Sequence, residues 1–138
     1  MSQRHPSHFS RVLIALQTTM ILGACAPMVD RRPETALERD RSVKVGVLDI
    51  VDARCDLEER CANIGPRGRF ESRSACESKM QGETAITLNT ADCPMGVERR
   101  KLDACVASIL AQDCGSIFDA LNRWNACRDG QICYSRND

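Results

Sequence analysis

Apolar residues recur at helical spacing in the second half of the chain. From about Val97 to Ala111 they follow an i, i+3, i+4, i+7, i+8 pattern, which predicts a helix with one apolar face. Asp113-Cys114-Gly115 interrupts the pattern, and Ser116 is placed to cap a further helix that ends near Cys127. Two amphipathic helices joined by so few residues favour a C-terminal antiparallel hairpin. The residues expected in its core are Leu102, Val106, Ile109, Leu121 and Trp124.

Two more helices are predicted in the middle of the chain. Helical spacing of apolar residues predicts the first over 47–62. Ser72 or Ser74 can cap the second, which we expect to be short and to end near Met80. Residues 82–96 show no helical periodicity and are predicted to form a loop. The fold class is therefore all-α, a small helical domain of about four short helices.

The predicted first helix has apolar residues on more than one side. Leu48 and Val51 lie on one side, whereas Ile50 and Leu57 lie on another. One side can pack against the hairpin, which leaves the other without a partner in the domain. The surface around Ile50, Leu57 and Ile64 is therefore the candidate contact site for a protein partner, unless another part of the chain covers it.

A short apolar stretch follows a basic leader at the start of the chain. Arg4 and Arg11 lie before this stretch, and polar residues 17–19 divide it. It ends in Leu22-Gly23-Ala24-Cys25, which is the pattern of a bacterial lipobox. In this interpretation residues 1–24 are a lipoprotein signal peptide. Cys25 is then acylated and becomes the mature N-terminus.

Two other interpretations of this leader remain open. A transmembrane helix needs about 20 mainly apolar residues, and this stretch is shorter and has a polar centre. Ordinary signal cleavage needs small residues, which Ala24 and Ala26 supply, but Pro27 would then follow the cut. We expect a lipid anchor at Cys25, which would hold the protein in the cell membrane on the periplasmic or outer side. Ala26, where Asp often marks retention at the inner membrane, favours the outer membrane.

The composition changes after residue 45. Residues 25–45 contain the acylated Cys and a charged segment with little to bury, which we expect to be a flexible tether. Residues 46–138 fit one small domain. Their few aromatic residues predict a small core, and a core of this size is commonly reinforced by covalent links.

The chain has nine cysteines, and because this number is odd, they cannot all pair with one another in disulfide bonds. Assigning Cys25 to lipid leaves an even set for disulfide bonds. This set is Cys55, Cys61, Cys76, Cys93, Cys105, Cys114, Cys127 and Cys133. The sequence does not choose among their many pairings, although Cys61–Cys76 is the pair that we single out. Structural zinc is the alternative, but the close Cys-x2-4-Cys spacing typical of zinc sites is absent from the sequence.

Catalysis would have to rely on carboxylates. Both histidines, His5 and His8, lie in the leader, and their removal excludes histidine-based triads and histidine metal sites from the mature chain. Carboxylates crowd the predicted first helix, where either a glycosidase-like acid pair or a solvated helix face would fit. They are Asp49, Asp52, Asp56, Glu58 and Glu59. We expect neither a metal nor a cofactor.

Residues 46–138 are slightly acidic, with 12 basic residues against 15 acidic ones. This balance argues against nucleic acid as a partner. Two basic clusters remain, Arg67/Arg69/Arg73 and Arg99-Arg100-Lys101. They fit contact with anionic lipid headgroups or with an acidic partner, or they are solvated.

The residues around the cysteines form a pattern over most of 50–133. It consists of Ala53-Arg54-Cys55, Glu59-Arg60-Cys61, Asn63-Ile64-Gly65, Ser72, Ala75-Cys76, Asp92-Cys93-Pro94, Gly96-Val97, Leu102-Asp103, Cys105 and Asp113-Cys114-Gly115, with Cys127 and Cys133 at its end. The pattern resembles an uncharacterised family of small cysteine-rich bacterial lipoproteins. Some members are labelled "natural product biosynthesis lipoprotein", which describes genomic company and not chemistry. The resemblance implies no catalytic or binding residues.

These features predict a membrane-anchored lipoprotein that presents a small, disulfide-stapled helical module to a periplasmic or surface partner, without catalytic activity. The alternative is a small carboxylate-based hydrolase, or an enzyme accessory subunit, in the cell envelope. An acidic cleft would favour the enzyme, whereas an exposed apolar patch would favour the partner.

Overall fold

The computed structural model describes residues 31–114, 127 and 129–135. They form the helices α1 (Ala36–Arg60), α2 (Arg73–Thr87) and α3 (Arg99–Leu110), and a one-turn helix, α5 (Asp129–Ile132). Within these residues the only extended pairs are two isolated bridges, Ile64–Phe70 and Val97–Cys133. The domain is all-α and disulfide-stapled, which confirms the predicted fold class.

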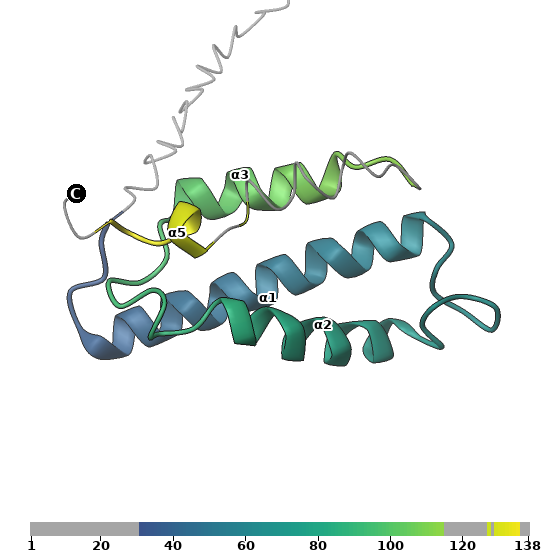
Figure 1. Ribbon diagram of the computed structural model, residues 1–138, viewed down its shortest axis with the longest axis horizontal. Helices are drawn as coiled ribbons and strands as arrows, with labels where there is room; N and C mark the ends of the chain where they lie inside the picture. The colour runs from purple at the N-terminus through teal and green to yellow at the C-terminus, as the bar shows by residue number, and fades with distance from the viewer. Residues whose placement is uncertain (1–30, 115–126, 128, 136–138) are drawn as a thin grey trace, which may run out of the picture.

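α1 is the central helix of the arrangement (Figure 1). α2 runs antiparallel to it on one side and α3 runs parallel to it on another, and both pack against it. The Cys61–Cys114 disulfide joins the chain just after α1 to the chain just after α3, as the parallel direction of these helices requires. The sequence predicts that the C-terminal hairpin organises the domain, whereas among the described residues α1 does.

α1 begins well before the predicted start at residue 47. The Thr35 hydroxyl accepts the Glu38 N–H (3.1 Å), and the Glu38 carboxylate accepts the Thr35 N–H (2.9 Å). These hydrogen bonds, above all the one from the Thr35 backbone, lower the pKa of Glu38. Val43 and Val47 then pack into the core. Residues 36–45, which the sequence assigns to a flexible tether, are therefore the first part of α1.

α2 extends past its predicted end at Met80. Its N-cap is Ser72, one of the two predicted caps, whose hydroxyl accepts a backbone N–H of the first turn at 3.2 Å. The i, i+4 stripe of Cys76 and Met80 continues through Thr84, which is buried although polar. Residues 82–87 are therefore helical and not the predicted loop, because the neighbouring helix covers a face that the sequence shows as polar.

α3 spans Arg99–Leu110, close to the predicted 97–111. Its buried residues are Leu102, Cys105 and Ile109, and Val106 is half-buried beside them. The helix predicted next, over 116–127, lies outside the described residues apart from Cys127. Two of the expected core residues of the hairpin, Leu121 and Trp124, also lie outside them.

Disulfide bonds pair all the cysteines of the domain. The pairs are Cys55–Cys76, Cys61–Cys114, Cys93–Cys133 and Cys105–Cys127. The predicted Cys61–Cys76 pair is wrong. Because α1 and α2 are antiparallel, Cys76 near the start of α2 lies opposite Cys55 inside α1, whereas Cys61 follows the end of α1 and meets the end of α3.

Candidate functional site

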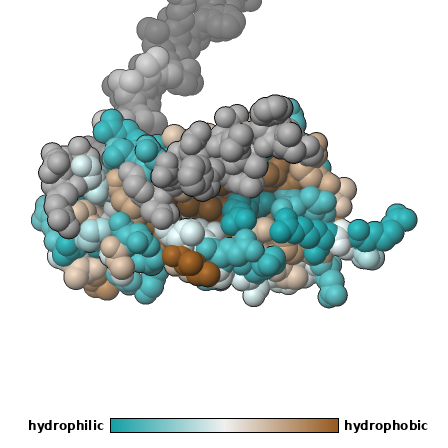
Figure 2. All heavy atoms as spheres, in the orientation of Figure 1, coloured by the Kyte–Doolittle hydropathy of each residue, from teal (hydrophilic) through white to brown (hydrophobic). Residues whose placement is uncertain are grey.

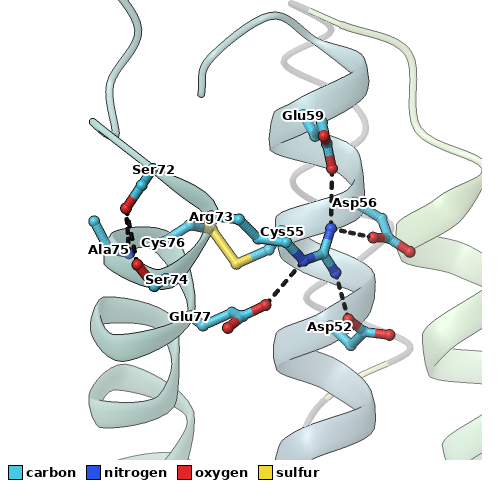
Figure 3. A network of polar contacts seen from close by, with 10 residues as sticks. All are labelled: Asp52, Cys55, Asp56, Glu59, Ser72, Arg73, Ser74, Ala75, Cys76 and Glu77. Atoms are coloured by element: carbon cyan, nitrogen blue, oxygen red, sulfur yellow. Dashed lines mark hydrogen bonds and ion pairs between the residues drawn. A yellow bond between two sulfur atoms is a disulfide. The ribbon is translucent and has the colours of Figure 1, made fainter. Parts of the chain in front are cut away.

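One arginine gathers four carboxylates between α1 and α2 (Figure 3). Arg73, the first residue of α2, directs its guanidinium at three carboxylates of α1 and one of its own helix. Its contacts are Asp56 (2.7 Å) and Glu59 (3.0 Å) through Nη1, Glu77 (2.8 Å) through Nε, and Asp52 through Nη2. We call these five residues the Arg73 network.

The Arg73 network acts as an interhelical clamp. Hydrogen bonds to Asp56, Asp52 and Glu77 raise the pKa of Arg73 above its already high ordinary value. The Cys55–Cys76 disulfide crosses between the same two helices beside the network (Figure 3). An ionic and a covalent link therefore hold the same turns of α1 and α2 together.

The two other candidate carboxylates of α1 are paired as well. Asp49 lies 2.8 Å from Arg99, and Glu58 lies 3.4 Å from Arg69. A glycosidase-like mechanism needs two carboxyl groups that face a substrate across a cleft. In the described structure the candidate carboxylates instead face arginines, so that they are engaged in ion pairs between segments of the protein.

The predicted contact residues do not form an exposed surface. Ile50 is in the core, with 6% of its surface exposed. Leu57 and Ile64 are half-buried and pack against the same core. The large apolar residues of α1 that stay open to solvent are instead Leu37, Val45 and Leu48, which are 69%, 41% and 54% exposed. The side of α1 that carries Ile50 therefore packs inward, and the prediction of a contact site there is corrected.

An apolar groove of about 400 Å³ lies between the first half of α1 and the last turns of α2. We call it the α1/α2 groove. Its apolar lining is Val43, Val47, Leu48, Ala85 and Leu88, and its polar lining is Asp40, Lys44, Gln81, Asn89 and Thr90. Leu48 is the large apolar side chain of this set that is most open to solvent. On the face shown in Figure 2, apolar surface is exposed in separate patches between hydrophilic side chains.

A larger cavity, of about 750 Å³, lies between α1 and the start of α3. We call it the α1/α3 cavity. Its lining residues are Arg31, Pro33, Ser42, Val45, Val97, Arg99, Arg100, Leu102, Asp103 and Tyr134. Three parts of the chain that are distant in the sequence meet here: α1 with the residues just before it, the start of α3, and the chain after α5.

Close contacts fix the walls of the α1/α3 cavity. The Val97 N–H donates to the Ser42 hydroxyl (3.1 Å). Gly96, at φ 87°, allows this approach, because a Cβ there would lie 2.7 Å from the Ser42 Oγ. Arg99 binds one carboxylate on α1 and Asp103 on α3, each at 2.8 Å, and the hydrogen bond to Asp103 raises the pKa of Arg99. The mouth of the cavity is therefore held in shape by both helices.

Neither hollow is evident from the sequence. The basic cluster 99–101 is the one visible signal for the α1/α3 cavity, but its proximity to Arg31 and Tyr134 depends on the tertiary fold. For the α1/α2 groove, Leu48 is visible as an apolar residue of a helix, but its exposure depends on which side of α1 packs inward.

Cys25, the predicted acylation site, lies outside the described residues. Among the residues that the structure describes, no three His, Cys, Asp or Glu side chains group as potential metal ligands. In the same part of the chain, no helix combines the length and the apolar character that a membrane span requires.

Comparisons with known proteins identify a family but no characterised relative. No curated protein and no solved structure matches the chain. One family model matches residues 55–135, which is more than half of the chain and includes every cysteine of the disulfide-bonded set. The family is described only as one of unknown function. The chain belongs to this family of unknown function, DUF6184.

Proposed function

We propose that this protein is an exported lipoprotein, anchored through Cys25, that presents its helical domain to a protein partner in the cell envelope and catalyses no reaction. The pairing of the cysteines carries this proposal. The disulfide bonds pair all the cysteines of the domain with one another. Of the nine cysteines, Cys25 alone is left over, and it stands at the end of the apolar leader.

The redox chemistry supports export. Disulfide bonds persist in oxidising compartments and are rare in the cytosol of most organisms. A domain that relies on four of them fits the periplasm or the cell surface. There, a remaining cysteine directly after a leader fits acylation better than a free thiol. The resemblance to cysteine-rich lipoproteins supports the same assignment, and Ala26 after Cys25 favours the outer membrane. The label "natural product biosynthesis lipoprotein" names no reaction or ligand and therefore adds nothing to this assignment.

A binding role fits the surface of the domain. The α1/α2 groove offers an apolar floor with polar edges, and Leu48 is 54% exposed beside it. An apolar side chain or the apolar face of a helix from a partner protein would fill such a groove. The Cys55–Cys76 disulfide bond and the Arg73 network link the two helices that form it, which limits the conformational entropy lost on binding. The alternative, a carboxylate-based hydrolase, gains no support from carboxylates that arginines engage.

The anchor is tested by mass spectrometry of the membrane fraction. We expect a mature chain that begins at an acylated Cys25, and we expect the Cys25→Ser variant to remain unprocessed. Normal processing and membrane retention of that variant would contradict the lipid anchor.

The binding role is tested by photo-crosslinking in intact cells. A photoreactive residue at Ala85, in the α1/α2 groove, should give one discrete adduct, and the additional change Leu48→Asp should abolish it because a charge would enter the apolar floor. The same photoreactive residue at Lys79, an exposed position of α2 outside the groove, is the matched control. Equal adducts from both positions, or an adduct that survives Leu48→Asp, would contradict binding in the groove.

A further inference from the structure

We infer that the α1/α3 cavity binds the headgroups of anionic phospholipids in the bilayer that holds Cys25. The domain would then stand on the membrane with this cavity facing down and with the Arg73 network facing away. This orientation rests on the proposed lipid anchor, and it adds which lipid chemistry the domain recognises and through which residues.

The first support is the length of chain between the anchor and the cavity. Arg31 lines the cavity, and it follows Cys25 by only six positions in the sequence. Six residues span at most about 20 Å even when fully extended. An acylated Cys25 would therefore keep the mouth of the cavity within about 20 Å of the headgroups, whatever path the chain takes.

The second support is charge complementarity. Arg31, Arg99 and Arg100 line the cavity together with one carboxylate, Asp103, and Arg99 is also paired with Asp49 of α1, so that three cations stand against two carboxylates. Guanidinium groups bind phosphate oxygens in a bidentate geometry, and for this reason arginine is favoured at phosphate sites. The cavity thus offers an excess of positive charge at the end of the domain to which the anchor leads.

The third support is the opposite charge of the Arg73 network, which lies farther along α1 than the cavity. The Arg73 network places four carboxylates around one arginine, between α1 and α2. α2 and α3 pack on different sides of α1 (Figure 1). The cavity uses the first half of α1 and the network uses its second half, so an anionic membrane surface would attract the cavity end and repel the network end, and both interactions favour the same orientation.

The fourth support is the lining of the cavity itself. Between the arginines it is apolar, with Pro33, Val45, Val97 and Leu102 among its walls. A volume of about 750 Å³ accommodates a ligand of moderate size. In a phospholipid, the phosphate of the headgroup lies next to the glycerol backbone and the first methylene groups of the acyl chains. This combination of an anion and an apolar stem fits an apolar hollow with arginines at its mouth better than a free anion does.

The test uses the mature lipoprotein in nanodiscs and reads amide hydrogen exchange by mass spectrometry. Nanodiscs of phosphatidylcholine alone are compared with nanodiscs that also contain phosphatidylglycerol. We expect exchange in residues 97–104 and 42–46 to slow only in the anionic nanodiscs, while α2 stays unchanged. This protection should disappear at about 1 M NaCl, where the Debye length is about 3 Å.

The matched variants remove two charges each. Arg31→Gln/Arg100→Gln should weaken the headgroup interaction about 25-fold, or about fivefold for each arginine, and so abolish the protection. Arg99 is left intact because it ties α1 to α3. Arg67→Gln/Lys79→Gln removes two exposed charges away from the cavity and should retain the protection. Equal protection in the two double variants would overturn the inference.

Two further outcomes separate the inference from the proposed function. Inorganic phosphate added to the phosphatidylcholine nanodiscs should not reproduce the protection, and if it does, the cavity is a site for free phosphate and the lipid assignment is wrong. The mass of the incorporated chain reports acylation independently. A chain without acyl groups on Cys25 overturns the proposed anchor and the orientation that rests on it. An acylated chain with equal exchange in both lipids overturns the orientation alone.

Discussion

Removal of the Cys61–Cys114 disulfide should lower the stability of the domain mainly by raising the conformational entropy of the unfolded chain. It joins residues 53 positions apart, the longest separation among the four bridges. Cys61 is half-buried and Cys114 is exposed, so that Cys61→Ala/Cys114→Ala leaves no cavity in the core. The double variant therefore changes the entropy of the unfolded chain with little change in native packing.

The expected magnitude follows from the entropy of loop closure. A loop of 53 residues corresponds to about 4 kcal/mol at 25 °C in the chain-entropy treatment. For a domain of this size, a loss of 1 kcal/mol lowers the melting temperature by about 4–8 °C. The double variant should therefore melt about 15–30 °C below the wild type.

Urea unfolding followed by circular dichroism measures the loss directly, with thiol counting to confirm that the other bridges remain closed. Cys55→Ala/Cys76→Ala is the comparison. It opens a separation of only 21 residues but empties two fully buried positions, so that its loss should combine about 3 kcal/mol of loop entropy with a packing loss. A loss below about 1 kcal/mol for Cys61→Ala/Cys114→Ala would refute the entropic reasoning, because it would show that the bridge barely restricts the unfolded chain.

Three further changes test other parts of the fold. Ile109→Ala should cost about 2–5 kcal/mol in urea unfolding, because the side chain is fully buried, whereas Ile86→Ala, at a position 76% exposed, should stay within about 0.5 kcal/mol of wild type. The pKa of Glu38 is lowered in the folded state, so the contribution of Glu38 to stability is present above the ordinary carboxyl pKa and is lost as the pH falls through the lower folded value. Glu38→Gln should therefore reduce the difference in unfolding free energy between pH 6 and pH 3. An unchanged difference would contradict this reasoning. Arg73→Gln should destabilise the domain more at low salt than at high salt, since four carboxylates would lose their shared cation, and a loss independent of salt would point to packing instead.

The periodicity of the sequence was sufficient to predict α3 because its apolar residues form a single stripe. Leu102, Cys105 and Ile109 repeat at the helical interval and are all buried. The same reasoning failed at the ends of the other helices. The start of α1 contains mostly charged residues around Val43, and the end of α2 is buried through polar Thr84. In both places, neighbouring helices decide burial, and local hydrophobicity does not show it.

The pairing of the cysteines and the α1/α3 cavity could not be derived from the sequence for a related reason. Both join residues that the chain separates widely, such as Cys61 with Cys114 and Arg31 with Tyr134. Which of these residues meet depends on α1 and α3 being parallel, and no local sequence pattern encodes the relative direction of two helices. The residue types were informative nevertheless, because an even set of cysteines predicts disulfide bonds before their partners are known.

If the domain stands on a membrane as proposed, the unbroken length of α1 sets the height of its far end above the bilayer. Its 25 residues span about 38 Å from the cavity end to the loop over 61–72. If the cavity end rests on the bilayer, the loop over 61–72 lies well into the aqueous space, and the length of α1 fixes its distance from the bilayer. Molecules close to the lipid surface would then meet the base of the domain, whereas molecules held farther out, such as those attached to the cell wall, would meet the tip.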